Sequence, residues 1–304
     1  MTEFEENIAN ALGETFARCG LPASLSTHRL SSAGADSASI LVVGDKTPLA
    51  ILAVSPEEFP DLVSVEQEKA SRMKGALGPE LGSPIVVPMA QGYLNGGRSY
   101  ALLPRKTPLS DSRIGWPIQR RSLKSHLTRW LRGINATTTT RQDSSGLYRS
   151  SLEHLCGMTS LSESIRSVSR RALDRLLAGD FVPRSTPMHN DLWKGNILLP
   201  SSGDDEDKQT FPFFVIDWRG SRIDGFPLFD LVRLSMSLKF SARELRQELI
   251  HSCQSLGCEF SDAPYYVATA LGEIASRRDQ FPVQAFLGMA EHCFVKLRST
   301  GSAP

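Results

Sequence analysis

The sequence lacks any apolar run long enough to span a bilayer. Its start, Met-Thr-Glu-Phe-Glu-Glu, lacks the basic and apolar regions of a signal peptide. Its five cysteines are odd in number and show no C-x-x-C spacing, which argues against a disulfide framework or a zinc site and favours a reducing compartment. We therefore expect a cytoplasmic protein without a transmembrane segment. A chain of 304 residues, 40% hydrophobic and 22% charged, is long enough for one large or two modest globular domains.

A net charge of +1 excludes no class of partner, but the charge is unevenly distributed. Between Arg105 and Ser150, ten basic residues face two acidic ones, which gives this stretch +8 and leaves −7 for the rest of the chain. The stretch lacks the regular interleaving of aromatic and basic residues that a base-stacking surface needs, so nucleic acid is not an expected partner. Two interpretations stay open, a solvated basic helix face and a surface for a neutral or anionic partner.

Residues 188–231 hold the most informative pattern. The segment Met-His-Asn-Asp-Leu-Trp-Lys-Gly-Asn reads H-x-D-x-x-x-x-N and contains Asp191 and Asn196, and the later segment Phe-Phe-Val-Ile-Asp-Trp ends an apolar run at Asp217. The runs 196–199 and 213–216 read as two strands of a β-hairpin whose polar tip points into solvent. Because the open ends of a hairpin lie together, Asn196 and Asp217 are expected to be neighbours, with Asp191 on the adjoining loop.

These three side chains suit phosphoryl transfer, which needs charge neutralisation and in-line positioning more than covalent chemistry. Mg²⁺ prefers oxygen ligands and keeps several waters, so one or two protein oxygens and the phosphates of a nucleotide complete its coordination. Each of the three residues could alone belong to a turn, since Asp and Asn favour turns. All three in this order favour the chemical interpretation.

Together with Gly-Phe-Pro-Leu-Phe-Asp-Leu at 225–231, these motifs resemble the catalytic core of the aminoglycoside phosphotransferase and choline kinase group, which has a protein-kinase-like fold. The resemblance implies an α+β, two-lobed architecture. A small mixed β lobe at 1–105 would bind nucleotide, and a larger, mainly helical lobe at 106–304 would carry catalysis and the acceptor. Helical patterns in the second lobe agree with this and occur near 118–136, 160–177, 228–238, 242–256, 264–277 and 284–297.

The resemblance also implies a role for each motif residue. Asp191 resembles the base that accepts the proton of the substrate hydroxyl, and Asn196 and Asp217 resemble the ligands of Mg²⁺. His189 resembles a buried residue that braces the loop. Asp230 resembles the carboxylate that hydrogen-bonds the loop backbone, with a carboxylate stabilised by the dipole of its own helix as the alternative.

Nucleotide contacts from the first lobe follow from the same resemblance. They would come from a loop of small residues that covers the phosphates and from the hinge between the lobes: Ser32, Ala33, Gly34, Leu103 and Arg105. A loop of small residues lets backbone N–H groups approach phosphate oxygens closely. The hinge backbone would bind the nucleotide base, although Pro104 removes one N–H donor there.

One position departs from the group's pattern. The group has a lysine on the strand at 49–54, paired with a glutamate of the following helix, and this chain has Ala53 at the aligned position. Glu68 fits the helix glutamate better than Glu66 does. Loss of such a charge in a water-poor site lowers rates by about 10²–10³-fold. Lys194, three residues after Asp191, is the better placed substitute, with a solvated loop lysine as its alternative interpretation.

The sequence therefore predicts an enzyme that moves the γ-phosphate of ATP or GTP, with Mg²⁺, to a hydroxyl of a small molecule. Because Arg219 and Arg222 follow Asp217, where relatives that bind cationic aminoglycosides generally need carboxylates, we expect a neutral or anionic, sugar-like acceptor. Two alternatives stay open. Ala53 favours a pseudokinase that binds a nucleotide or a partner without turnover, and the basic helix at 105–132 allows a scaffold that docks an anionic surface.

Overall fold

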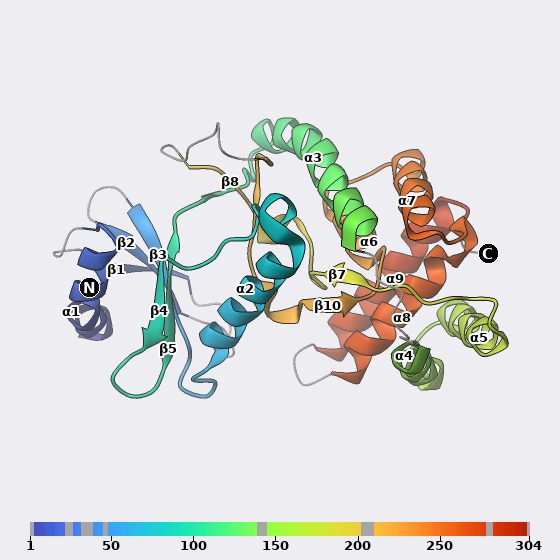
Figure 1. The fold of residues 1–304 in the computed structure, drawn as a ribbon, viewed down its shortest axis with the longest axis horizontal. Helices are drawn as coiled ribbons and strands as arrows, with labels where there is room; N and C mark the ends of the chain where they lie inside the picture. The colour runs from blue at the N-terminus through green and yellow to red at the C-terminus, as the bar shows by residue number, and fades with distance from the viewer. Residues whose placement is uncertain are drawn as a thin grey trace. The chain divides into compact units, whose positions relative to one another are not determined.

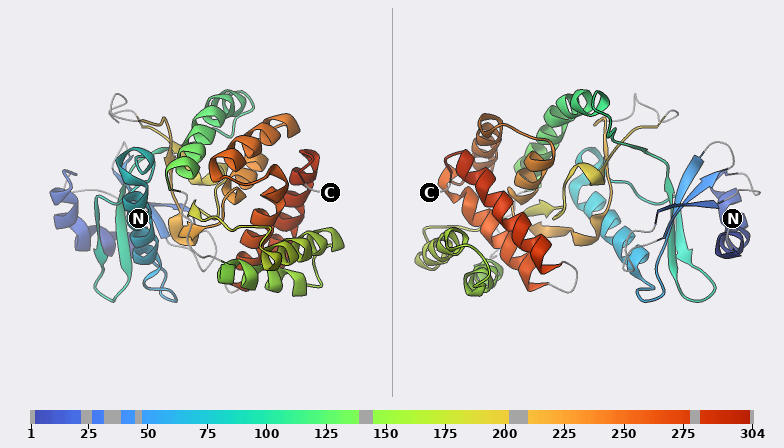
Figure 2. Two further views of the ribbon diagram at one scale, coloured as in Figure 1. Left: turned by 45° about the vertical axis from the view of Figure 1, so that its right-hand side comes forward. Right: turned by 180° about the vertical axis from the view of Figure 1, so that it is seen from behind.

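The computed structural model describes residues 3–21, 27–31, 39–44, 48–138, 145–201, 210–277 and 282–302. The chain divides into two compact units (Figures 1 and 2). The first contains Met1–Pro108 and Leu198–Arg219, and the second contains Leu109–Ile197 and Gly220–Pro304. We expected one boundary near residue 105 and all later residues in the second lobe. The segment 198–219 instead belongs to the first unit, because its strands join a small sheet there.

The first unit is built on a sheet of five antiparallel strands in the order β1-β2-β3-β5-β4. The strands are β1 Thr27–Ser31, β2 Ser39–Gly44, β3 Pro48–Val54, β4 Ala90–Tyr93 and β5 Ser99–Pro104. In the central pair, Ala53 of β3 lies opposite Ala101 of β5. Alternation along β3 therefore sends Ala53 to one face of the sheet and its neighbour Leu52 to the other.

Two helices cover the two faces of this sheet, as Figures 1 and 2 show. Helix α1 (Glu3–Arg18) packs Leu12 and Phe16 against the face that carries Leu52. Helix α2 (Leu62–Leu81) packs Val63 against the face that carries Ala53. The N-terminus of α2 is tied to the sheet because the backbone N–H of Val63 donates to Ser55 Oγ at 2.9 Å. The position of α2 relative to β3 is thus fixed by both packing and hydrogen bonding.

The predicted hairpin is confirmed within a second, three-stranded sheet. Its strands are β6 (Thr107–Pro108), β8 (Ile197–Leu199) and β9 (Phe214–Val215), and β8 is the middle strand. The backbone N–H of Val215 also donates to Pro84 O at 2.8 Å, which joins β9 to the segment that follows α2. The predicted polar tip falls largely on 202–209, outside the described residues.

The second unit is mainly helical, as expected. Its helices are α3 Gly115–Thr138, α4 Ser145–Gly157, α5 Glu163–Ala178, α6 Phe229–Ser237, α7 Ala242–Leu256, α8 Ala263–Ser276 and α9 Val283–Ser299. A two-stranded sheet of β7 (Thr186–Met188) and β10 (Arg222–Gly225) lies among them. The predicted α+β class is therefore confirmed. Within the described ranges, every helix is too short or too polar to span a lipid bilayer.

The packing of α8 against α4 gives a direct test of the helical core. A Cβ atom added to Gly272 would lie 2.0 Å from the backbone oxygen of Ser151, so the two helices would have to separate. We expect Gly272→Ala to lower the free energy of unfolding by about 1–3 kcal/mol or more.

The matched control is Gly288→Ala in α9, where nothing lies within 4 Å of the added Cβ. This control should be neutral or stabilising, by up to about 1 kcal/mol. Denaturant unfolding of both variants is the measurement, and equal midpoints would contradict the predicted contact.

Candidate functional site

The H-x-D loop of the second unit is held by helix α6. Asp230, in the first turn of α6, accepts hydrogen bonds from the backbone N–H groups of His189 at 2.6 Å and Asn190 at 3.0 Å. Burial raises the pKa of the Asp230 carboxyl, and His189 and the two backbone donors act in the opposite direction. The bond to the loop backbone that the resemblance implied for Asp230 is thus confirmed. Asn190 has a φ of 76°, a left-handed conformation that a tight, externally held turn can enforce.

His189 is buried, with 2% of its surface exposed. Its Nδ1 atom accepts the backbone N–H of Asp191 at 3.3 Å. This agrees with the bracing role expected for His189.

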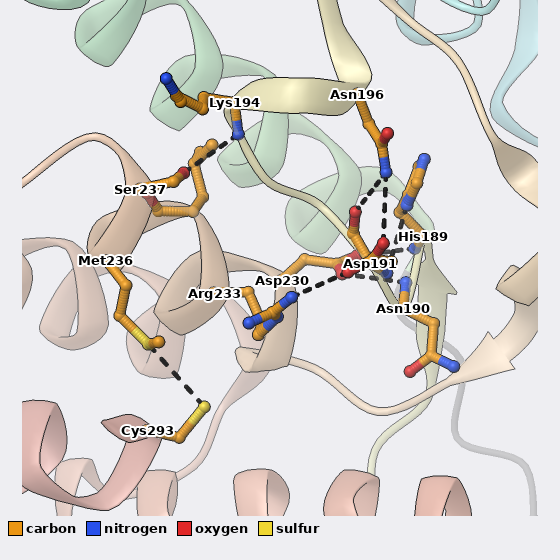
Figure 3. A network of polar contacts seen from close by, with 11 residues as sticks. His189, Asn190, Asp191, Lys194, Asn196, Asp230, Arg233, Met236, Ser237 and Cys293 are labelled. Atoms are coloured by element: carbon orange, nitrogen blue, oxygen red, sulfur yellow. Dashed lines mark hydrogen bonds and ion pairs between the residues drawn. The ribbon is translucent and has the colours of Figure 1, made fainter. Parts of the chain in front are cut away.

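The Asp191 carboxylate has two side-chain partners, which Figure 3 draws. Its Oδ1 accepts a hydrogen bond from Nη2 of Arg233 at 2.8 Å, and its Oδ2 lies 3.4 Å from Nδ2 of Asn196. The Asp191 side chain is still 44% exposed, whereas that of Arg233 is 16% exposed. The carboxylate is therefore oriented from the protein side and remains accessible from the solvent side.

Asn196 ends a short 3-10 turn, η1 (Lys194–Asn196), immediately before β8. Its Nδ2 donates to the backbone oxygen of Asp191 at 2.9 Å. The side-chain carbonyl oxygen consequently points away from Asp191, as Figure 3 shows. An amide held in this way offers an oxygen donor of the kind that Mg²⁺ binds.

Lys194 is directed away from the Asp191 carboxylate in Figure 3. Its Nζ pairs with Asp111 Oδ1 at 2.9 Å and lies 5.3 Å from the ring centre of Trp116. Its backbone N–H donates to Ser237 Oγ at 3.1 Å. The structure thus brings Asn196 to Asp191 but holds the ammonium of Lys194 at another place on the second unit.

Asp217 belongs to the first unit, two residues after β9. Its side chain is exposed and its φ of 63° lies in the left-handed region, which is uncommon for a residue with a side chain. Trp218 anchors the turn, since it is 2% exposed and its Nε1 donates to Val215 O at 3.1 Å. Strained backbone of this kind is enriched at functional sites.

Helix α2 presents Glu66, not Glu68, to the Asp217 segment. Glu68 is 71% exposed and pairs with Arg72 at 3.9 Å. The pKa of Glu66 is raised to about 7, first by burial and then by the Asp217 carboxylate, against the opposing charge of Arg219. Of the two glutamates considered for this helix, the structure therefore favours Glu66.

The structure describes two of the five other residues that were predicted to contact the nucleotide. Ser32, Ala33 and Gly34 lie outside the described residues. Leu103 is half-buried on β5, and Arg105 follows this strand with an exposed side chain.

Two of the five Lys and Arg residues of α3 are paired with acidic residues of α7. Lys124 Nζ lies 2.9 Å from Glu244 Oε1, and Arg132 Nη2 lies 2.6 Å from Glu248 Oε1. These two pairs hold one helix against the other. They favour a structural role for this part of the basic stretch over a docking surface.

No protein-family model and no curated protein matches the sequence. Solved structures do match it over nearly the whole chain. A GDP complex of a mutant aminoglycoside 2′-phosphotransferase IIIa has a TM-score of 0.59 at 12% identity and covers 98% of each chain. Choline kinase LicA from Streptococcus pneumoniae has a TM-score of 0.55 at 13% identity, covering 98% of this chain and 100% of its own. The chain has their fold.

A thermostable mutant of aminoglycoside phosphotransferase APH(4)-Ia gives the same result, with a TM-score of 0.55 at 13% identity and coverage of 97% and 98%. The protein-kinase-like architecture that the three motifs predicted is thereby confirmed. At these identities the likeness concerns the fold, and the assignment of roles rests on the residues of this chain.

Proposed function

We propose that this kinase-fold protein transfers the γ-phosphoryl group of ATP or GTP to a hydroxyl group of a small molecule. One observation carries the proposal: the Asp191 carboxylate is 44% exposed while the backbone around it is tied to the buried Asp230. Structures of the same fold contain GDP, AMP, or AMP-PNP together with hygromycin B, which supports a nucleotide and a small-molecule acceptor as the substrates.

In this proposal Asp191 orients the acceptor hydroxyl and accepts its proton. The transition state of phosphoryl transfer is loose, so placing the hydroxyl in line with the phosphorus matters more than strong basicity. The bonds from Arg233 and Asn196 suit such a role, because they restrict the rotation of the carboxylate. Lys194 would take part in the transfer only if its ammonium left the exposed Asp111, with which it pairs.

Asn196 and Asp217 are proposed as the protein ligands of Mg²⁺, which when bound would neutralise charge on the nucleotide phosphates. Their chemistry fits this ion, since one is an exposed carboxylate and the other an amide with its oxygen directed away from Asp191. Among the described residues, no three His, Cys, Asp or Glu side chains gather into a metal cluster. A kinase-type Mg²⁺ site needs only one or two protein oxygens beside the phosphates, so this agrees with the proposal.

The acceptor is proposed to be neutral or anionic and sugar-like. Of the two arginines that suggested this, Arg222 is occupied, with Nη1 bound to Glu273 at 2.5 Å and Nη2 to Asp224 at 3.1 Å. Arg233 now gives the stronger reason, because its ion pair with Asp191 compensates the negative charge of the proposed base. A polyamine or aminoglycoside would therefore gain little attraction from this carboxylate. An acceptor panel of sugars, sugar phosphates and aminoglycosides tests this, and preference for the cationic members would contradict it.

Replacing Asp217 with Ala tests the proposed function. Saturating Mg-ATP should stabilise the wild type by RT ln(1 + [L]/Kd) in free energy and so raise its melting temperature. If Asp217 holds Mg-nucleotide, this rise should disappear in the variant. Glu57→Ala, which removes an 84% exposed carboxylate of the same unit, is the control and should keep the rise. An unchanged rise in Asp217→Ala would reject the assignment.

A nucleotide-binding module without turnover is the second candidate, favoured by the apolar surroundings of Ala53. A melting-temperature rise without transfer to any acceptor of the panel would support this candidate.

A further inference from the structure

The first unit has no cation on β3 where relatives of this fold were expected to carry one. Ala53 is 6% exposed and packs with Val63 of α2 and Ala101 of β5 in a small apolar cluster. These three residues fill the space between the strand and the helix. A positive charge for the Asp217 segment must therefore come from another element.

Helix α2 offers such a charge beside the face that meets β3. Glu66 follows Val63 by three residues and Lys69 follows Glu66 by three, so each side chain neighbours the one before it on the helix surface. Glu66 interacts electrostatically with Asp217, and Nζ of Lys69 donates a hydrogen bond to the backbone oxygen of Arg219, two residues beyond Asp217. One side of α2 thus brings a carboxylate and an ammonium to the segment that carries the proposed metal ligand.

Three other described cations of this unit are held at other places. The structure holds them at backbone oxygens or over a ring: Arg98 at Ser55 O, Lys74 at Ile85 O and Lys106 over the ring of Phe214. Among the described residues, the side chain of Arg219 is a competitor, because its charge also acts on Glu66. Any test must separate it from Lys69.

We propose that Lys69 of helix α2 supplies the positive charge for the nucleotide phosphates that a lysine on β3 would otherwise supply. The inference rests on the proposed function and names a further residue of that site. Lysine suits the role, because its ammonium has three donors on a flexible four-carbon stem. The bond to Arg219 O positions the ammonium beside the segment that carries Asp217.

The first experiment compares Lys69→Ala with Lys74→Ala in the full chain. Both lysines lie on α2 and both bind a backbone oxygen of the same unit, so the pair is matched in charge, helix and type of contact. The readouts are the dissociation constant of Mg-ATP by calorimetry and the rate of phosphate transfer or ATP hydrolysis. We expect Lys69→Ala to weaken Mg-ATP binding by about tenfold or more and to lower turnover by about 10²-fold. Lys74→Ala should stay at the wild-type values, and equal behaviour of the two variants would overturn the proposal.

The second experiment moves the charge to the strand. In the double variant Ala53→Lys with Lys69→Ala, part of the lost Mg-ATP affinity should return, since the ammonium can reach the phosphates from β3. Recovery supports the proposal, and a folded double variant with no recovery counts against it.

If the double variant fails to fold because Ala53 is packed, Lys69→Gln decides, as this side chain keeps a donor to Arg219 O without the charge. Lys69→Gln should lose Mg-ATP affinity as Lys69→Ala does, and wild-type affinity in Lys69→Gln would overturn the proposal.

Variants at the competing cations separate the remaining outcomes. Lys69→Ala could keep wild-type affinity for Mg-ATP while Arg219→Ala or Lys194→Ala loses it. That outcome would assign the charge to Arg219 or Lys194 and overturn the inference. The proposed function itself fails if the wild type binds no Mg-ATP. If the wild type binds Mg-ATP, Asp217→Ala does not, and Lys69→Ala binds as the wild type does, only the inference about Lys69 fails.

Discussion

Replacing Asp191 with Asn is expected to lower turnover by about 10²–10⁴-fold while Mg-ATP binding stays near that of the wild type. Asn keeps the size of the side chain and can still accept a hydrogen bond from Arg233, so the loop should hold its shape. The group that accepts the acceptor's proton is lost, whereas Asn196 and Asp217 are untouched. Turnover should be measured as acceptor-dependent ADP release, and Mg-ATP binding as the shift in melting temperature.

The control for this variant is Asp174→Asn, which makes the same change of charge on the exposed side of α5. It should leave both measurements unchanged. Turnover of Asp191→Asn close to that of the wild type would remove Asp191 from the reaction. Loss of Mg-ATP binding together with turnover would instead show that Asp191 acts on the nucleotide.

The sequence predicted the hairpin and the loop that precedes it for local reasons. Two short apolar runs on either side of a polar segment pair readily, and β8 and β9 do so. The bonds from Asp230 to the loop backbone followed from the motif at 225–231. Membership of 198–219 in the first unit could not be predicted in this way, because it depends on the distant pairings of β8 with β6 and of β9 with Pro84.

The choice between Glu66 and Glu68 was within reach of the sequence. The buried residues that define the inner side of α2 are Val63, Gln67, Ala70, Met73 and Leu77. Glu66 lies three residues after Val63 and four before Ala70, so helical geometry places it on that side. Glu68 lies between these positions on the outer side, which explains its exposure. The position of each glutamate on the helical period therefore selects Glu66, whereas the distance from the apolar run had favoured Glu68.

Two features of the loop depend on contacts that no local pattern contains. Lys194 turns toward Asp111, which is 83 residues away in the sequence. Arg233 reaches Asp191 from α6, 42 residues away. Arg233 follows Asp230 by three residues, so both lie on one side of α6. Once Asp230 is assigned to the loop, the arginine one turn later becomes a candidate for the same loop.

Replacing Asp230 with Ala is expected to reduce stability and turnover together. The buried carboxylate accepts two backbone hydrogen bonds, and its removal leaves the N–H groups of His189 and Asn190 without this acceptor. Hydrogen bonds to a charged group contribute about 1.5–3 kcal/mol each, so the free energy of unfolding should fall by about 3 kcal/mol or more. For a chain of 304 residues the melting temperature should fall by about 5 °C or more. Turnover should fall as well, because Asp191 sits on the released loop.

Asp230→Asn is the matched variant, since it keeps the shape of the side chain and one of the two oxygen acceptors, while the charge and the second acceptor are lost. It should lie between the wild type and Asp230→Ala in melting temperature. This pattern differs from that of Asp191→Asn, in which turnover falls and the melting temperature does not. A melting temperature of Asp230→Ala equal to that of the wild type would mean that the loop holds its left-handed turn at Asn190 without the Asp230 carboxylate. The exposed carboxylate of Asp191 would then owe its orientation to Arg233 and Asn196 alone.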